Sequence, residues 1–195
     1  MDVKKLFNLL IDGVIKPEEV WKDFLSADIR LNELLKNYVV PIVVSIAVIT
    51  FLLNMIFGYP LVNGRVHLSF IRTLWLGVGN VVGFFISLYI FGWVGAFLAE
   101  KFGGENNFEK AVLMLFLISL PSLVGQVLGT LPIVGFFFSL ILSIYSLVLL
   151  YKAFPIFLKV SKNNQVKIFI LFLIASVVLG MILGALMGAV FSPRI

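Results

Sequence analysis

The stretch EKFGGENNFEKAVLMLFLISLPSLVGQVLGTLP, residues 100–132, contains the sharpest change of composition in the chain. Charged residues crowd its first third, up to Lys110, and an uncharged run then begins at Ala111 and continues to Tyr151. A helix that crosses a bilayer needs about 20 predominantly apolar residues, and this run is about twice as long. It must therefore cross, turn and cross back, and the Gly-Thr-Leu-Pro sequence at 129–132 is the turn signal in its middle.

The overall composition predicts an integral membrane protein. The 195 residues are 61% hydrophobic and 13% charged, whereas soluble domains are about half apolar and about a quarter charged. A chain of this length cannot bury such an excess of apolar side chains in a core, because small domains have too much surface. The chain has no cysteine, which excludes a disulfide framework and a thiolate metal site.

Five uncharged apolar segments predict an all-α polytopic fold, a bundle of five transmembrane helices over residues 38–191. Turn residues and charged loops separate the segments. The predicted spans are residues 38–57, 74–98, 111–129, 132–151 and 168–190. In the loop before the third span, Gly103 and Gly104 predict a turn and Asn107 predicts an N-cap.

Residues 1–37 form a separate segment, which contains thirteen of the 25 charged residues. Carboxylates are scattered through it, so it does not have the pattern of a signal peptide. Apolar residues recur at helical spacing in three pieces, and Pro17 opens the second of them. Its apolar stripe includes Trp21 and Phe24. Such amphipathic helices lie either on the cytoplasmic membrane surface or against the bundle.

The distribution of Lys and Arg predicts the orientation of the bundle. Five spans put the N-terminal segment and the loops at 99–110 and 152–167 on one side, with twelve of the 15 Lys and Arg residues. The other side has Arg65, Arg72 and Arg194. Because cytoplasmic loops carry the excess of positive charge, we expect a cytoplasmic N-terminus and a C-terminus on the outer side.

Three glycines at four-residue spacing, Gly180, Gly184 and Gly188, mark one face of the last span. Glycines at this spacing let another helix backbone approach closely. The pattern predicts a helix-packing face. The partner is either another helix of the same chain or the same helix of a second copy in a homo-oligomer.

The spans lack the groups that catalysis requires. No Asp, Glu, Lys, Arg or His lies in the middle of any predicted span, although ion-coupled transporters and intramembrane hydrolases place ionisable groups there. A nucleophilic serine needs a base within hydrogen-bond reach, and a metal site needs several ligands. His67, the only histidine, lies in a loop. We therefore expect a non-enzymatic protein with no cofactor and no metal.

Asn54, Asn80 and Gln126 are the residues with amide side chains within the predicted spans. An unpaired amide is costly inside a bilayer. These side chains either line a polar pocket or form hydrogen bonds with neighbouring helices. The first alternative would favour a small-molecule or lipid transporter.

A family resemblance runs through most of the chain. It rests on Gly103-Gly104, Phe108, Ala111, Ser119-Leu120-Pro121, Leu131-Pro132 and Tyr145, and nearer the N-terminus on Pro17, Trp21, Tyr38 and Pro41. With these residues at this spacing, residues 16–191 resemble the Yip-type family of five-span membrane proteins. Ile118 departs from the pattern, since family members often carry an aromatic residue there. Only Tyr38 and Pro41 remain of the acidic Asp-Leu-Tyr-Gly-Pro-like motif of the eukaryotic branch.

The resemblance implies a non-enzymatic membrane protein with a cytosolic N-terminus. Eukaryotic members act in vesicle trafficking and membrane shaping with GTPase partners, and the loss of the acidic motif argues against Rab-type GTPase binding here. The chain looks like a minimal, prokaryotic-like member, for which we expect a plasma (inner) membrane location.

These observations lead to one main functional hypothesis. We expect a membrane-organising scaffold that binds lipid, above all anionic lipid, or a membrane or cytosolic protein partner, and no nucleic acid. Lysines beside a bilayer are each worth about 1 kcal/mol toward anionic lipid. The predicted contact residues are Trp21, Phe24, Lys159, Lys162 and Lys167. The alternative is the transporter, with its cavity near Asn54, Asn80 and Gln126.

Overall fold

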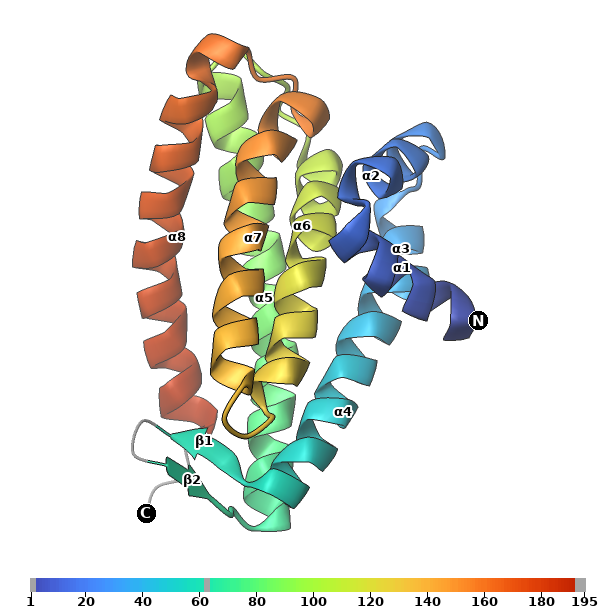
Figure 1. Ribbon diagram of the computed structural model, residues 1–195. Helices are drawn as coiled ribbons and strands as arrows, with labels where there is room; N and C mark the ends of the chain where they lie inside the picture. The colour runs from blue at the N-terminus through green and yellow to red at the C-terminus, as the bar shows by residue number, and fades with distance from the viewer. Residues whose placement is uncertain (1–2, 62–63, 192–195) are drawn as a thin grey trace.

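The computed structural model describes residues 3–61 and 64–191 of the chain (Figure 1). Almost all of this part is helical, with one short antiparallel hairpin. The elements in chain order are α1 (Val3–Ile15), α2 (Pro17–Ser26), α3 (Leu31–Leu34), the π-helical turn η1 (Leu35–Val39), α4 (Val40–Phe57), β1 (Tyr59–Leu61), β2 (Gly64–Val66), α5 (Phe70–Lys101), α6 (Phe108–Gly129), α7 (Gly135–Phe157) and α8 (Lys162–Phe191).

The predicted fold class is confirmed. Five helical segments of the described residues are long and apolar enough to cross a membrane: Leu31–Phe57, Phe70–Lys101, Phe108–Gly129, Gly135–Phe157 and Lys162–Phe191. The protein is thus an all-α polytopic membrane protein. Several helices run beyond the apolar stretches, because helical hydrogen bonding continues into polar flanks. Helix α8, for example, starts at Lys162, six residues before the predicted span.

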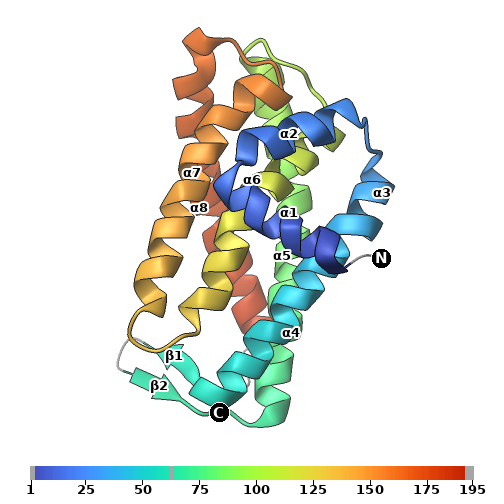
Figure 2. The ribbon, with the colours of Figure 1, turned by 45° about the vertical axis from the view of Figure 1, so that its right-hand side comes forward.

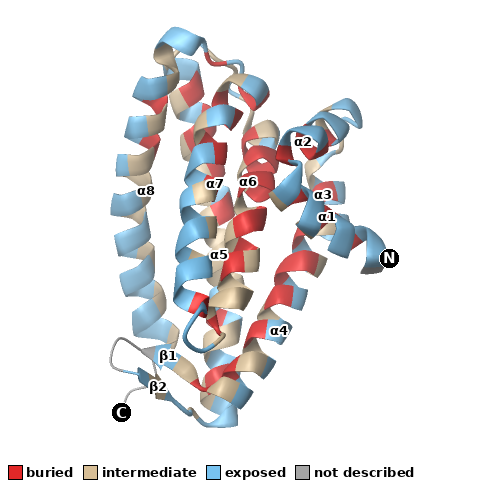
Figure 3. Ribbon diagram, viewed as in Figure 1, coloured by how far each residue is buried: buried red, intermediate tan, exposed pale blue. Residues whose placement is uncertain are grey.

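Helix α6 forms the centre of the bundle and packs against α1, α4, α5 and α7. The most apolar window of α6 is 61% buried, whereas that of α8 is only 11% buried, and Figure 3 shows the same contrast. After Lys110, α6 is uncharged and apolar on all sides, which suits a position enclosed by other helices. The apolar part of residues 100–132 is therefore the core of the fold.

The two ends of the bundle differ (Figure 1). At one end, which we call the polar end, lie the loops at 102–107 and 158–161. At the other, which we call the hairpin end, lie the β1–β2 hairpin and the turn between α6 and α7. In the hairpin, Tyr59 pairs with Val66. In the turn, Ile133 takes a positive φ of 67°.

One arginine joins two helices at the hairpin end. Arg65 Nε donates to the carbonyl oxygen of Phe57 at 2.7 Å, and Nη2 donates to that of Gly58 at 2.9 Å. The same Nη2 donates to the carbonyl oxygen of Thr130. These carbonyls end α4 and follow α6, where helix backbones leave acceptors unsatisfied and attract positive charge. Arg65 therefore holds the ends of two sequence-distant helices together.

Candidate functional site

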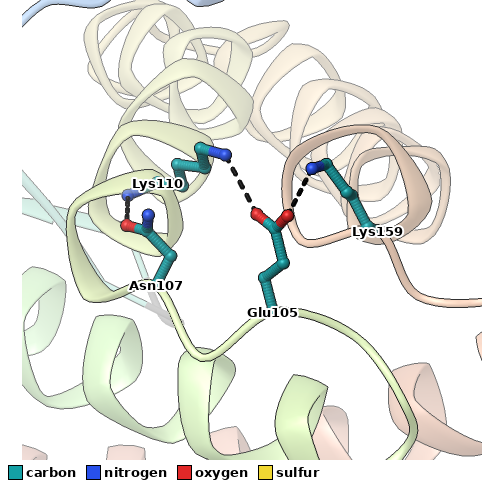
Figure 4. Close-up of polar contacts among 4 residues, drawn as sticks. All are labelled: Glu105, Asn107, Lys110 and Lys159. Atoms are coloured by element: carbon teal, nitrogen blue, oxygen red, sulfur yellow. Dashed lines mark hydrogen bonds and ion pairs between the residues drawn. The ribbon is translucent and has the colours of Figure 1, made fainter.

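The polar end contains an ion cluster centred on Glu105 (Figure 4). One carboxylate oxygen of Glu105 lies 2.9 Å from Lys110 Nζ, and the other contacts Lys159 Nζ. Beside it, Asn107 Oδ1 accepts a hydrogen bond from the Lys110 backbone N–H at 2.9 Å, so the predicted N-cap of α6 is confirmed. Glu105 thereby connects the start of α6 to the loop after α7.

Backbone contacts reinforce this connection between the two loops. The Glu105 N–H donates to the carbonyl oxygen of Leu158 at 2.7 Å. Asn164 Nδ2 donates to the carbonyl oxygen of Phe102 at 3.0 Å. Gly104 lies against the carbonyl oxygen of Leu158, where a Cβ atom would clash with backbone. The polar end is therefore one interlocked surface.

The two lysines lower the pKa of the Glu105 carboxyl, the hydrogen bond from Lys159 more than that from Lys110, while partial burial acts in the opposite direction. Hydrogen bonds to a charged carboxylate favour its ionised form. The Glu105 carboxylate therefore stays ionised at neutral pH and forms an ion pair with the Lys159 ammonium group.

The three predicted lipid-contact lysines differ in their surroundings. Lys159 is 66% exposed but paired with Glu105. Lys162 and Lys167 lie in the first two turns of α8, and both are exposed. These two lysines, rather than Lys159, present unshared charge at the polar end among the ion pairs described here.

The predicted surface role of Trp21 and Phe24 is wrong, because both side chains are buried. Trp21 is 1% exposed, and its ring meets that of Phe157 edge to face with centroids 5.6 Å apart. The ring of Phe24 lies 5.0 Å from that of Tyr38. The packing alternative therefore holds for this stripe, since α2 turns it toward the bundle.

Helix α1 instead presents apolar side chains outward. It crosses α6 and approaches α4 (Figure 2). Leu6 and Leu9 are buried, whereas Phe7 and Ile15 are 61% and 68% exposed. The exposed edge of α1 lines an apolar groove of about 340 Å³ with side chains of α4 and α6. We call it the α1 groove.

The opposite edge of α1 is polar. Lys5 and Asp12 lie beside Asp23 of α2. Lys5 Nζ also lies 5.4 Å from the centre of the Tyr38 ring, a cation–π distance. Helix α1 thus has one apolar exposed edge and one charged edge.

The α8 glycines do not pack closely within the chain. A Cβ atom added to Gly180, Gly184 or Gly188 would have no neighbour within 4 Å. The three glycines line a groove of about 390 Å³ between α5 and α8, which we call the glycine groove. The reason is that larger α8 side chains fill the contact: Phe191 lies against Gly79, and Met187 lies near Gly83. The intramolecular alternative is therefore wrong for these glycines.

The predicted polar-pocket residues have three different environments. Asn54 is buried, and its Oδ1 has no hydrogen-bond partner among the described residues. Asn80 is exposed and lines the glycine groove, which includes neither Asn54 nor Gln126. Gln126 is half-buried on α6. Within residues 3–61 and 64–191, no three metal-ligating side chains are placed to hold an ion.

The membrane helices and the polar end belong to a part of the chain that matches a known protein family. The family profile described as the Yip1 domain matches residues 13–186. The chain belongs to the Yip1-domain family. The match runs from the end of α1 into the last turns of α8, so it covers all five membrane helices. Neither the curated proteins nor the solved structures contain a match to the chain.

In this Yip1-domain protein, several residues that connect distant elements could not be predicted from the sequence. Glu105, Lys110 and Arg65 carry no local pattern in the sequence that predicts their contacts. Lys152 Nζ lies 3.1 Å from Glu18 Oε1, which joins α7 to α2. A single sequence has no signal for pairs so far apart, because their meeting depends on how the helices pack.

Proposed function

We propose that this Yip1-domain protein is a non-enzymatic scaffold that organises the membrane by inserting the apolar edge of α1 into the bilayer beside α4 and α6. The observation that carries the proposal is the exposed apolar edge of α1. Phe7, Ile11 and Ile15 project from a helix that is already docked on the bundle. A helix with one apolar and one charged edge lies in the plane of the bilayer interface.

The charges near α1 fit the same arrangement. The charged edge, with Lys5 and Asp12, would face the aqueous side, where α2 lies. Lys162 and Lys167 would add attraction for anionic headgroups from α8. The excess of Lys and Arg in the N-terminal segment and the loops at 99–110 and 152–167 supports a cytoplasmic polar end. The likeness to a minimal, prokaryotic-like family member supports a plasma membrane location.

The position of α1 can be tested with single cysteines, because the chain has none of its own. Spin labels at F7C and I11C in liposomes of the full chain are expected to collide with oxygen, which concentrates in the bilayer. A label at N8C, on an exposed polar position of the same helix, is expected to collide with a water-soluble nickel chelate. Equal nickel access at all three positions would rule out insertion of α1.

The organising role needs a second measurement. Vesicles reconstituted with the protein are expected to become smaller or tubular as the protein-to-lipid ratio rises, measured by electron microscopy. The double variant Phe7→Gln and Ile11→Gln should abolish the change, whereas Asn8→Gln should retain it. An unchanged vesicle shape with the wild-type chain would overturn the scaffold role even if α1 inserts.

A further inference from the structure

A cavity of about 440 Å³ lies between α5, α6, α7 and α8, and all four helices contribute serine side chains to it. We call it the serine cavity. Its serines are Ser87, Ser119, Ser122, Ser143, Ser146 and Ser176. Aromatic rings of Phe84, Phe91 and Phe172 also line it. The cavity therefore combines apolar walls with hydroxyl groups.

The hydroxyls lie deep within the membrane-spanning part of the bundle. Ser87 is near the middle of α5 (Phe70–Lys101), Ser146 near the middle of α7 (Gly135–Phe157) and Ser176 near the middle of α8 (Lys162–Phe191). Polar groups at that depth have no water with which to form hydrogen bonds, so they need partners within the protein or in a ligand.

Within the part of the chain that the structure describes, three of these serines have hydrogen-bond partners, and Ser176 does not. Ser122 donates its hydroxyl hydrogen to Ser146 Oγ at 2.7 Å, and Ser119 donates to the carbonyl oxygen of Phe116 at 2.7 Å. Ser176 Oγ is buried without a hydrogen-bond partner in the described residues. A hydroxyl supplies one donor and two acceptors. Ser176 Oγ is covered by neighbouring atoms, and a change of its χ1 rotamer would bring this unused hydroxyl to an occupant of the cavity.

The occupant can arrive from the bilayer. Helix α8 is the least enclosed of the membrane helices, with 11% of its apolar window buried. Ser87 lines both the serine cavity and the glycine groove between α5 and α8. The two hollows are therefore adjacent, and the groove leads along the lipid-facing side of α8.

The charge of the residues that line the two hollows determines which class of lipid can bind there. No Asp, Glu, Lys, Arg or His is among the residues that line the serine cavity or the glycine groove. A phosphate group at this depth would lose its hydration without gaining a cation, which is strongly unfavourable. An ester carbonyl or a free hydroxyl needs only a hydrogen-bond partner.

We propose that the serine cavity binds an uncharged glycerolipid of the diacylglycerol type. Its ester or hydroxyl group hydrogen-bonds with Ser176, and its acyl chains lie against the aromatic wall and along the glycine groove. The proposal does not depend on α1 or on the scaffold role, because it concerns the other side of the bundle.

The test uses the full chain in nanodiscs with two photoreactive lipids that carry the same labelled acyl chain. One is a diacylglycerol, and the other is a phosphatidylglycerol. Mass spectrometry of the adducts is expected to place the diacylglycerol on peptides of α7 and α8. Ser176→Ala, which keeps the shape of the site, should weaken diacylglycerol labelling about three- to tenfold, the range for one neutral hydrogen bond. Ser176→Phe, which fills the cavity, should abolish it.

The matched control is Ser45→Ala, because Ser45 is an exposed serine of α4 outside both hollows. It should leave labelling unchanged. Equal labelling by the two lipids at α7 and α8, or labelling that neither Ser176 variant alters, would overturn the proposal. Gly184→Cys tests the competing occupant: an efficient disulfide-linked dimer in native membranes would show that a second copy covers the groove, which would also overturn it.

Discussion

Trp21 and Phe157 meet edge to face with ring centroids 5.6 Å apart, and this contact attaches α2 to the end of α7. Both side chains are almost completely buried. The N-terminal segment is therefore part of the folded body, since its largest aromatic residue belongs to the same core as α6 and α7.

Trp21→Ala is expected to lower the free energy of unfolding by about 3–5 kcal/mol, because it removes a large buried ring and leaves a cavity. The measurement is chemical unfolding of the detergent-solubilised chain. Trp93→Ala is the matched control, since Trp93 is 64% exposed, and it should change stability by about 0.5 kcal/mol or less. Similar losses in the two variants would contradict the buried role of Trp21.

Removing the Arg65 side chain is expected to loosen the hairpin end. Arg65→Ala leaves the carbonyls of Phe57, Gly58 and Thr130 without their shared donor. The loss should be about 2–3 kcal/mol, as for hydrogen bonds to a charged group. Thermal melting and proteolysis at the hairpin measure it. Arg30→Ala, at an exposed position beside α3, should melt like the wild-type chain.

Glu105 should make stability depend on pH. Its pKa is lower when folded, so its contribution to stability is present above its unfolded pKa, near 4.5, and is lost as pH falls through the folded value. Glu105→Gln should therefore melt below the wild-type chain at pH 7, and the difference should shrink below about pH 4. Glu33→Gln, on the exposed side of α3, controls for loss of charge. A melting-temperature difference between Glu105→Gln and the wild-type chain that grows as the pH falls would contradict the predicted role of Glu105.

Two glycine substitutions should separate a tight contact from an open groove. Gly104→Ala places a Cβ against the Leu158 carbonyl and should cost about 1–3 kcal/mol, because backbone there cannot easily move. Gly184→Ala, with nothing within 4 Å of the new atom, should be tolerated in the isolated protein. The melting temperatures of the two purified variants measure this difference. If both substitutions lowered the melting temperature equally, the Gly104 contact would not hold the two loops of the polar end together.

Orientation can be tested directly with fusion reporters. An enzyme active only in the cytoplasm should work when fused at Met1 and fail when fused at Ile195, since twelve of the 15 Lys and Arg residues lie on the side of the N-terminal segment. Activity at both ends would contradict an odd number of spans.

By itself, the sequence determined the class of protein, the five membrane helices and the family. These properties depend on composition, on uncharged runs long enough to cross a bilayer and on local turn signals such as Asn107 and the residues at 129–132. Each helix is readable within a few dozen consecutive residues, because it reflects the transfer of one helix from water to lipid. The family pattern is spread over residues 16–191.

Only the tertiary structure decided which side of each helix faces protein. Trp21 turned out to be buried, Phe7 exposed, and the glycine face of α8 open, although the same residue types fit the opposite assignments. In lipid, an apolar side chain fits equally well against a neighbouring helix or against acyl chains. The hydrophobic pattern therefore cannot show whether a side chain faces a neighbouring helix or lipid. Packing between distant helices, such as α5 and α8, decides which of these environments each side chain has.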